Sequence, residues 1–339
     1  MMQEYWITEY GAVADGVTNC AAAIQAAVDA AAPLEWFAAL GLYTRTDEAG
    51  RVYPYSNQAA DVLALLEGHL ARLGVEVRTG CTVQTLSQNR GGYVVLFSNA
   101  DGADESLRAD AVVCAMGGSA GPQFGTDGFG PRFAAQCGGA LAPLYPCLTA
   151  LQCAKPDKRL AGIRAKAHAA LYSGSTLLAD YRGEVQFTDY GLSGIPVFQV
   201  SRFAARALDQ GKRVTALVDF MPSWDDGEAF GLLKKRASLL GHKTVEELFT
   251  GLLNKKLALG LIKLAGIKPS QKSGDLSPKQ LKLLLGQIKS YEAIVMSVNP
   301  FANAQVCCGG VDTGEVDAAT MESRLHANLY LAGELLDVD

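Results

Sequence analysis

Apolar residues recur along the chain with two different periods, and these periods predict alternating helices and strands. Residues 61–73 carry apolar side chains at helical spacing, and Asp61 can cap the start of that helix. Residues 75–77 and 93–97 alternate or run apolar, which is typical of strands. Residues 111–115 are wholly apolar and lead into glycines, so they predict a strand that is buried on both faces.

The middle of the chain mixes both patterns, and residues 214–220 predict a further strand. Residues 329–333 then repeat the strand-into-glycine pattern of residues 111–118. Two such elements, one on each side of the middle segment, predict a single sheet domain that is interrupted by an insertion. Helices are predicted within the insertion at residues 227–240, 244–253, 256–264 and 277–289.

Composition restricts the classes of function. The chain has 339 residues, 49% hydrophobic and 19% charged, which is typical of a globular protein of one or two domains. The net charge of −5 argues against a nucleic acid as partner, because a phosphate backbone calls for a basic face. Lysines between residues 255 and 289 fall among leucines at helical spacing, which favours a solvated helix face over an anion-binding patch. No apolar run reaches about 18 residues, so we expect no membrane partner.

The eight cysteines show no CxxC pair and no histidine at metal-ligand spacing. Cys114 and Cys147 lie inside apolar runs, where we expect buried free thiols. Cys307 and Cys308 are interpreted as two small buried residues rather than as a redox pair. The N-terminus lacks the basic and apolar regions of a signal peptide, and together these features predict a protein of the reducing cytoplasm.

Three stretches carry candidate chemistry. Residues 115–130 hold six glycines after the predicted buried strand, where backbone amides can approach a ligand; the alternative is a surface loop. Residues 183–196 alternate glycines with hydroxyl groups that can face a pocket or belong to a plain hairpin turn. Residues 332–339 place Glu334 beside a strand-end glycine, where a carboxylate can bind a sugar hydroxyl or cap the turn.

These stretches carry a family resemblance. Residues 36–339 resemble the BaiN/YhiN-type FAD-dependent oxidoreductases, also known as the aminoacetone oxidase family. The resemblance implies an α/β fold, with an incomplete FAD/NAD(P)-binding Rossmann-like domain and an inserted mixed β-barrel and helical domain. It implies a partial FAD-binding domain at 34–142, the inserted domain at 143–300 and a return to the FAD-binding domain at 301–339. The matching segments are residues 50–56, 115–130, 144–146, 183–201, 304–311 and 320–339.

The resemblance also implies roles for individual residues. The backbone of Val83, after a strand, would meet adenine. The remaining implied FAD contacts are Met116, Gly117 and Gly118 at the strand-end turn, and Gly333 and Glu334 near the ribityl chain and pyrophosphate. The barrel edge that faces the isoalloxazine ring would consist of Thr188, Tyr190, Gly191 and Ser193. No acid, base or nucleophile is implied, since the flavin performs the hydride transfer in such enzymes.

The sequence departs from the family at both ends. The family opens with a GxGxxG-type turn that holds the pyrophosphate, and residues 11–16 do not form that motif. The family also continues past Asp339 with a glycine-rich segment. Losing the phosphate turn removes several charge-assisted hydrogen bonds of roughly 1.5–3 kcal/mol each, so we expect weak or absent FAD retention. Residues 4–32, which predict a strand, a turn and an alanine-rich helix ended by Pro33, instead resemble the opening of pectate-lyase-like β-helix proteins. Residues 1–33 are therefore interpreted as a foreign-looking segment on a truncated or chimeric reading frame.

The leading hypothesis is an FAD-dependent oxidoreductase with a small-molecule substrate. The two segments of the family that this sequence lacks imply that the enzyme can have lost its activity. The alternative is a non-catalytic remnant or interaction module of a flavoprotein. A pectin-active enzyme is a third hypothesis, which the absence of repeated short strands disfavours. The sequence indicates neither the substrate, nor the electron donor or acceptor, nor the oligomeric state.

Overall fold

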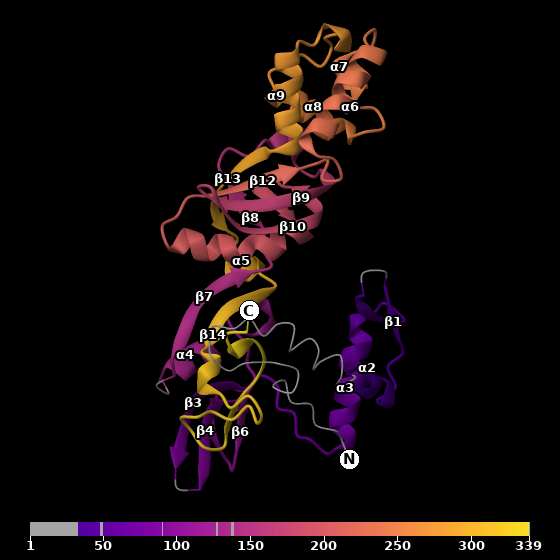
Figure 1. Cartoon of the computed structure of the whole chain (residues 1–339). Coiled ribbons are helices and arrows are strands. Elements are labelled where there is room, and N and C mark those ends of the chain that lie inside the picture. The colour runs from indigo at the N-terminus through magenta and orange to yellow at the C-terminus, as the bar shows by residue number, and fades with distance from the viewer. Residues whose placement is uncertain (1–32, 48–49, 90, 127, 137–138, 339) are drawn as a thin grey trace. The chain divides into compact units, whose positions relative to one another are not determined.

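A computed structural model of the chain describes residues 33–47, 50–89, 91–126, 128–136 and 139–338 (Figure 1). It divides into two compact units. Of the described residues, the first unit contains those of 33–115, 133–136, 139–140 and 311–336; the second contains those of 116–132, 141–310 and 337–338. The strand, turn and helix predicted before Pro33 lie outside the described residues.

The first unit holds the two strand-into-glycine segments side by side. Strands β6 (Val112–Cys114) and β15 (Leu329–Leu331) pair in parallel, with Leu331 opposite Cys114. The two segments thus belong to one sheet, as predicted, and they are neighbours in it although more than 200 residues separate them. The unit also contains α2 (Pro33–Ala39), β1 (Thr44–Thr46), β2 (Val52–Pro54), α3 (Ala59–Arg72), β3 (Thr82–Asn89), β4 (Gly92–Ser98) and β5 (Asp104–Ala109); α4 (Phe129–Gln136) spans its boundary with the second unit.

Three local predictions for the first unit are wrong. Residues 75–77 belong to no strand. The strand that precedes β4 and pairs with it is β3, which is largely exposed and has no alternation of apolar and polar residues. The cap residue of α3 is Gln58, and Asp61 lies in the first turn, where its carboxylate accepts a hydrogen bond from Ser56. Strand β6 is not buried on both faces, because Val113 is 64% exposed.

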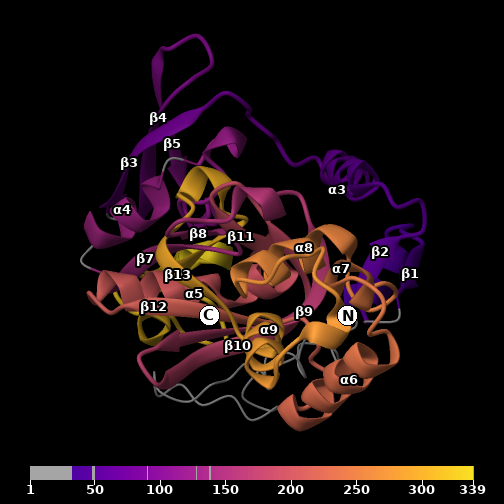
Figure 2. The same cartoon turned by 90° about the horizontal axis from the view of Figure 1, so that it is seen from above.

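The second unit is built on a closed antiparallel barrel, which confirms the predicted inserted barrel (Figures 1 and 2). Alternate residues of the predicted strand 214–220 face the core: Val214, Ala216 and Val218 are each at most 3% exposed. The barrel order is β10-β11-β8-β13-β12-β9, from β8 (Leu151–Cys153), β9 (Arg164–Ser173), β10 (Thr176–Phe187), β11 (Gly191–Gly194), β12 (Val214–Asp219) and β13 (Tyr291–Val298).

Four helices between β12 and β13 form a cap on the barrel (Figure 1). They are α6 (Asp226–Leu239), α7 (Val245–Leu248), α8 (Lys255–Leu264) and α9 (Pro278–Lys289), and their buried leucines belong to the same core as the barrel. Capping boxes begin three of them, with Asp225, Thr244 and Ser277 as the cap residues. Three of the four predicted helices are confirmed, whereas α7 is shorter than the predicted 244–253. Its C-cap is Phe249, and Gly251 then adopts a φ of 77°.

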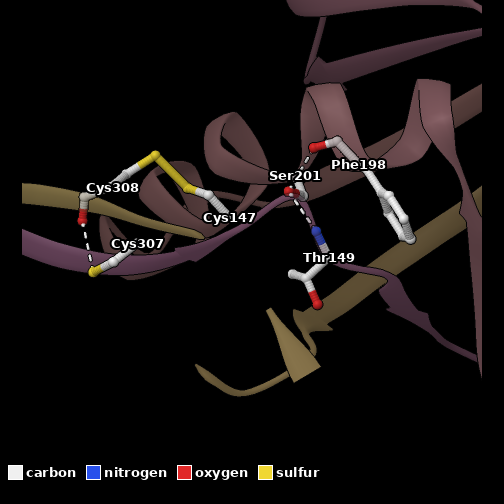
Figure 3. Close-up of a disulfide and its surroundings, with 6 residues drawn as sticks. All are labelled: Cys147, Thr149, Phe198, Ser201, Cys307 and Cys308. Carbon is white, nitrogen blue, oxygen red and sulfur yellow. Dashed lines mark hydrogen bonds between the residues drawn. A yellow bond between two sulfur atoms is a disulfide. The ribbon is translucent and has the colours of Figure 1, made fainter. Parts of the chain in front are cut away.

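A disulfide joins the strands that flank the insertion. Strands β7 (Leu141–Cys147) and β14 (Val306–Val311) are neighbours, and Cys147 is bonded to Cys308 with a Cα–Cα distance of 6.0 Å (Figure 3). The prediction of a free thiol at Cys147 is therefore wrong. The partners are 161 positions apart, and only strand pairing brings them together.

Helix α5 (Ile195–Asp209) is fixed beside that disulfide. The hydroxyl of Ser201 is fully buried; it accepts a hydrogen bond from the Thr149 amide at 3.3 Å and donates one to the Phe198 carbonyl at 2.8 Å (Figure 3). The helix packs on β9, β10 and β7, so it ties the disulfide-linked strand to the barrel wall.

Candidate functional site

The first part of the candidate site is the carboxyl edge of the parallel pair in the first unit. The amide of Ala332 donates to the carbonyl of Cys114 at 3.0 Å, which keeps the two strand ends in register. Gly333 and Glu334 then form a 3₁₀ turn, η7 (Gly333–Leu335). Ligands of α/β sheets bind outside the carboxyl ends of the strands, so this edge is where a dinucleotide is expected.

The backbone geometry of two glycines, Gly333 after β15 and Gly117 after β6, fits a dinucleotide. Gly333 has a φ of 72°, and nothing lies within 4 Å of the position that a Cβ would occupy there. Gly117 in the second unit has a φ of 71° and the same open space. A side chain would be strained at either position and would fill the space that a phosphate or sugar needs to reach the backbone. The residues present therefore fit the cofactor that the sequence resemblance implies.

The glycine-rich segment after β6 is held by its own hydrogen bonds. Thr126 Oγ1 donates to the carbonyl of Gly118 at 2.6 Å, and a 3₁₀ turn, η2 (Pro122–Phe124), follows Gly121. The Gly121 amide donates to the carbonyl of Phe301 at 3.1 Å. This bond places the segment beside the turn η5 (Phe301–Asn303), which follows the barrel strand β13. Met116, at the start of the segment, is 36% exposed.

Val83 occupies a different place from the one predicted. It is the second residue of β3 rather than a residue that follows a strand, and it pairs with Phe97 next to a register shift. The difference follows from the missing strand at residues 75–77. A contact of its backbone with adenine stays a prediction.

The second part of the candidate site is the turn between β10 and β11 in the barrel. The Thr188 amide donates to the Gly191 carbonyl, and the Gly191 amide donates to Thr188 Oγ1, both at 2.9 Å. The Thr188 hydroxyl therefore accepts a hydrogen bond within the turn itself. Ser193 is half-buried opposite Gln186 on β10, and Tyr190 is 40% exposed at the turn.

A small cavity under the turn is too narrow for a substrate. Its volume is about 40 Å³, and its lining includes Cys153, Asp157, Thr188 and Tyr291. Burial raises the pKa of the Cys153 thiol to about 11 and the pKa of Tyr291 to about 12. Both groups are therefore neutral near pH 7, and the space suits one or two water molecules rather than a reacting ligand.

A chain of polar side chains leads to Tyr190 from the neighbouring strands. Ser297 Oγ donates to Gln152 Oε1 at 3.0 Å, and Gln152 Nε2 donates to Asn299 Oδ1 at 3.0 Å. Asn299 Nδ2 then donates to the hydroxyl of Tyr190 at 3.4 Å. Sequence reasoning named Tyr190 and missed the other three. They are distant in sequence and become neighbours through the pairing of β8 with β13, which no local motif signals.

Charge is unevenly distributed in the second unit. Residues 225–289 contain twelve lysines and arginines against six acidic residues, a net charge of +6 in a chain whose total is −5. Ten of the lysines are exposed: Lys234, Lys235, Lys243, Lys255, Lys256, Lys263, Lys268, Lys272, Lys279 and Lys282. The structure thus confirms the solvated helix faces and shows that they add up to a basic cap.

Two features are absent from the part of the chain that the structure describes. None of its helices has the length and apolar character to cross a membrane. No group of three or more His, Cys, Asp or Glu side chains in the same part is arranged to hold a metal ion.

Comparison with known proteins gives a matching family and, among its relatives, the three that follow. The HI0933-like protein Rossmann domain model matches residues 10–339, which includes most of the segment that resembles β-helix openings. The chain is 41% identical over 307 residues to the 3-dehydro-bile acid delta(4,6)-reductase of Clostridium scindens, covering 90% of this chain and 74% of the relative.

Two more distant relatives are ribosomal RNA dihydrouridine synthases. The Haemophilus influenzae protein is 27% identical over 230 residues, which are 67% of this chain and 54% of the relative. The Escherichia coli protein is 24% identical over 286 residues, which are 83% and 67%. The chain thus spans about half the length of the first of these two.

Proposed function

Because the chain belongs to the HI0933-like family of Rossmann-domain flavoprotein oxidoreductases, we propose that it is an FAD-dependent reductase of a small, lipophilic enone. An enone is a carbon–carbon double bond conjugated to a carbonyl group. The single observation that carries this proposal is the 41% identity to a bile acid delta(4,6)-reductase across both units. The name of that relative describes the reduction of a ring system that bears an oxo group, and we therefore propose an enone as the substrate class.

The chain's own residues would bind the cofactor and orient the substrate. Gly333 and Glu334 in the first unit would contact the dinucleotide through their backbone. Met116, Gly117 and Gly118 in the second unit are the further FAD contacts that the family resemblance implies. A bound flavin supplies the hydride in such a reaction. The barrel turn with Tyr190 would bind and orient the substrate.

FAD binding is the first test. Flavin fluorescence is titrated with the purified full chain, and the same titration is made with Gly333→Val, which adds a branched side chain at a φ of 72°. We expect the parent protein to quench the fluorescence, with the weak affinity that the sequence predicts, and the variant to bind at least tenfold more weakly still. A folded parent protein that leaves the fluorescence unchanged would overturn the proposal and favour the non-catalytic interaction module.

The reaction itself is the second test. The FAD-loaded protein is incubated without oxygen with dithionite and a steroid dienone, and loss of the conjugated absorbance band is followed. We expect loss in proportion to the amount of protein, beyond that seen with free FAD and dithionite. FAD binding without any such loss would exclude this substrate class while keeping the flavoprotein assignment.

A second candidate substrate is RNA, and the basic cap is the observation that favours it. The cap carries a net charge of +6 in an otherwise acidic chain, and two relatives act on ribosomal RNA. Binding through such a cap would weaken steeply with salt, because each neutralised phosphate releases counterions. Filter binding of ribosomal RNA at two salt concentrations tests this, with Lys279→Gln/Lys282→Gln as the variant. Equal retention by parent and variant at both concentrations would dismiss the RNA candidate.

A further inference from the structure

The hydrogen-bond chain that ends at Tyr190 has a defined direction. Gln152 Nε2 donates to Asn299 Oδ1, so the amide nitrogen of Asn299 is the group that faces the phenol. Ser297 supports the same orientation by donating to Gln152 Oε1. An amide nitrogen has protons and no acceptor capacity, so the phenol oxygen of Tyr190 accepts from it. The proton of the phenol must therefore point to another acceptor.

The chain rests on rigid backbone. Gln152 and Ser297 are paired residues on the neighbouring strands β8 and β13, and the amide of Asn299 donates to the carbonyl of Ala150 at 2.9 Å. The carbonyl of Tyr190 accepts from the amide of Cys153 at 2.9 Å, which fixes the backbone of the turn. The side chains that orient the phenol thus have little freedom, while the phenol itself is 40% exposed and open to a ligand.

The glycine-rich segment approaches the same place. Its Gly121 amide is bonded to the carbonyl of Phe301, two residues after Asn299. All of these residues belong to the second unit. An exposed, oriented hydrogen-bond donor therefore lies on the part of the barrel against which the glycine-rich segment is held.

We propose that the Tyr190 hydroxyl donates a hydrogen bond to the carbonyl oxygen of the substrate, and that Asn299 and Gln152 are positioning residues for that donor. This inference rests on the proposed reduction of an enone. When a hydride adds to the double bond of an enone, negative charge develops on the carbonyl oxygen. A donor already aimed at that oxygen stabilises the charge and fixes which end of the substrate enters first.

Binding measurements test the inference without any turnover. The probes are testosterone, which has an enone carbonyl, and 4-androstenediol, in which a hydroxyl replaces that carbonyl. Both are titrated into the full chain supplied with oxidised FAD, by calorimetry, and the enone absorbance band of bound testosterone is recorded. We expect the parent protein to shift that band to longer wavelength, as hydrogen bonding to the carbonyl does.

The variants separate the donor from its supports. In Tyr190→Phe we expect about tenfold weaker testosterone binding, loss of the band shift and a smaller loss of androstenediol binding, because the hydroxyl of androstenediol is a weaker acceptor than the enone carbonyl. Asn299→Asp places an acceptor where the donor was, so the carboxylate captures the phenol proton and the result should match Tyr190→Phe. Tyr181→Phe is the matched control. Tyr181 is a 46% exposed tyrosine on β10 outside the hydrogen-bond chain, and we expect parent-like binding from it.

Each outcome decides a separate point. Failure of the parent protein to bind either steroid would count against the proposed substrate class. Binding with an unchanged band and equal affinity in Tyr190→Phe would overturn the donor role and leave the proposed reaction standing. A parent-like Asn299→Asp variant would overturn the positioning role alone. Near-ultraviolet circular dichroism checks that each variant is folded, and Asn299→Ala, which adds no charge, should weaken testosterone binding roughly threefold.

Discussion

The disulfide between Cys147 and Cys308 should contribute a large part of the stability of the barrel unit. It joins β7 to β14 and closes a loop that contains the whole barrel and its helical cap (Figure 3). In the chain-entropy model, cross-linking residues 161 positions apart lowers the entropy of the unfolded chain enough to stabilise the fold by about 5 kcal/mol. Domain stabilities are commonly only about 5–15 kcal/mol, so reduction should bring the unit close to its unfolding limit.

Urea unfolding in the presence and absence of dithiothreitol measures this contribution. Trp224 lies in the barrel unit, and its fluorescence should report a lower urea midpoint for the reduced protein. Comparing oxidised and reduced forms of one chain avoids the cavity that a substitution would leave. Cys81→Ala serves as a control, because Cys81 is outside the disulfide and its loss should not change the difference. Equal midpoints in the two conditions would refute the reasoning, provided that peptide mapping shows Cys147 and Cys308 unlabelled before reduction.

Three further predictions concern the barrel unit. Lys289→Met should lower the free energy of unfolding by about 3 kcal/mol, since Lys289 Nζ lies 2.6 Å from Asp219 Oδ2 and also donates to two backbone carbonyls. A urea titration that shows a loss below about 1 kcal/mol would contradict this. Gly191→Ala should destabilise the barrel by about 2–3 kcal/mol, because the new Cβ would stand 2.1 Å from a carbonyl oxygen of β8. Gly231→Ala in α6 meets open space and should stabilise the protein by up to about 1 kcal/mol, and calorimetry that ranks the two variants the other way would refute the prediction. Burial raises the pKa of the Cys153 thiol to about 11, so iodoacetamide should alkylate it at pH 8.5 at least tenfold more slowly than a free thiol; fast alkylation of the folded protein would show that the thiol is accessible and ionised. The stability that the neutral thiol provides should be lost as the pH rises from about 9 towards 11.

The elements that could be predicted from sequence are those whose cause is local. The cap helix α9 begins at Ser277, whose side chain accepts from the Gln280 amide, and its buried positions follow helical spacing. Strand β12 was predicted because every second residue is apolar, and those residues face the barrel interior. The presence of β6 and β15 in one sheet domain was also predicted, since both apolar runs end in glycine, whereas their direct parallel pairing was not.

The elements that were missed depend on contacts between distant residues. Strand β3 is largely exposed and polar, so its sequence carries no apolar alternation, and hydrogen bonds to β4 alone make it a strand. The partner of Cys147 is 161 positions away and has no spacing rule. The chain from Ser297 to Tyr190 was missed for the same reason, because glutamine, serine and asparagine are ordinary surface residues until a barrel makes them neighbours.

The barrel separates the residues that hold the fold from those that we propose contact the substrate. Its interior is filled by fully buried residues such as Leu151, Leu171 and Val218, which a polar substitution would disrupt. The side chains of Gln152 and Tyr190 lie on the partly exposed side of the same strands and turns, and the core does not depend on them. Substitution there should change carbonyl recognition while the barrel stays intact. If substrate choice resides in such polar residues, as proposed, one scaffold can serve relatives named for a bile acid and for ribosomal RNA.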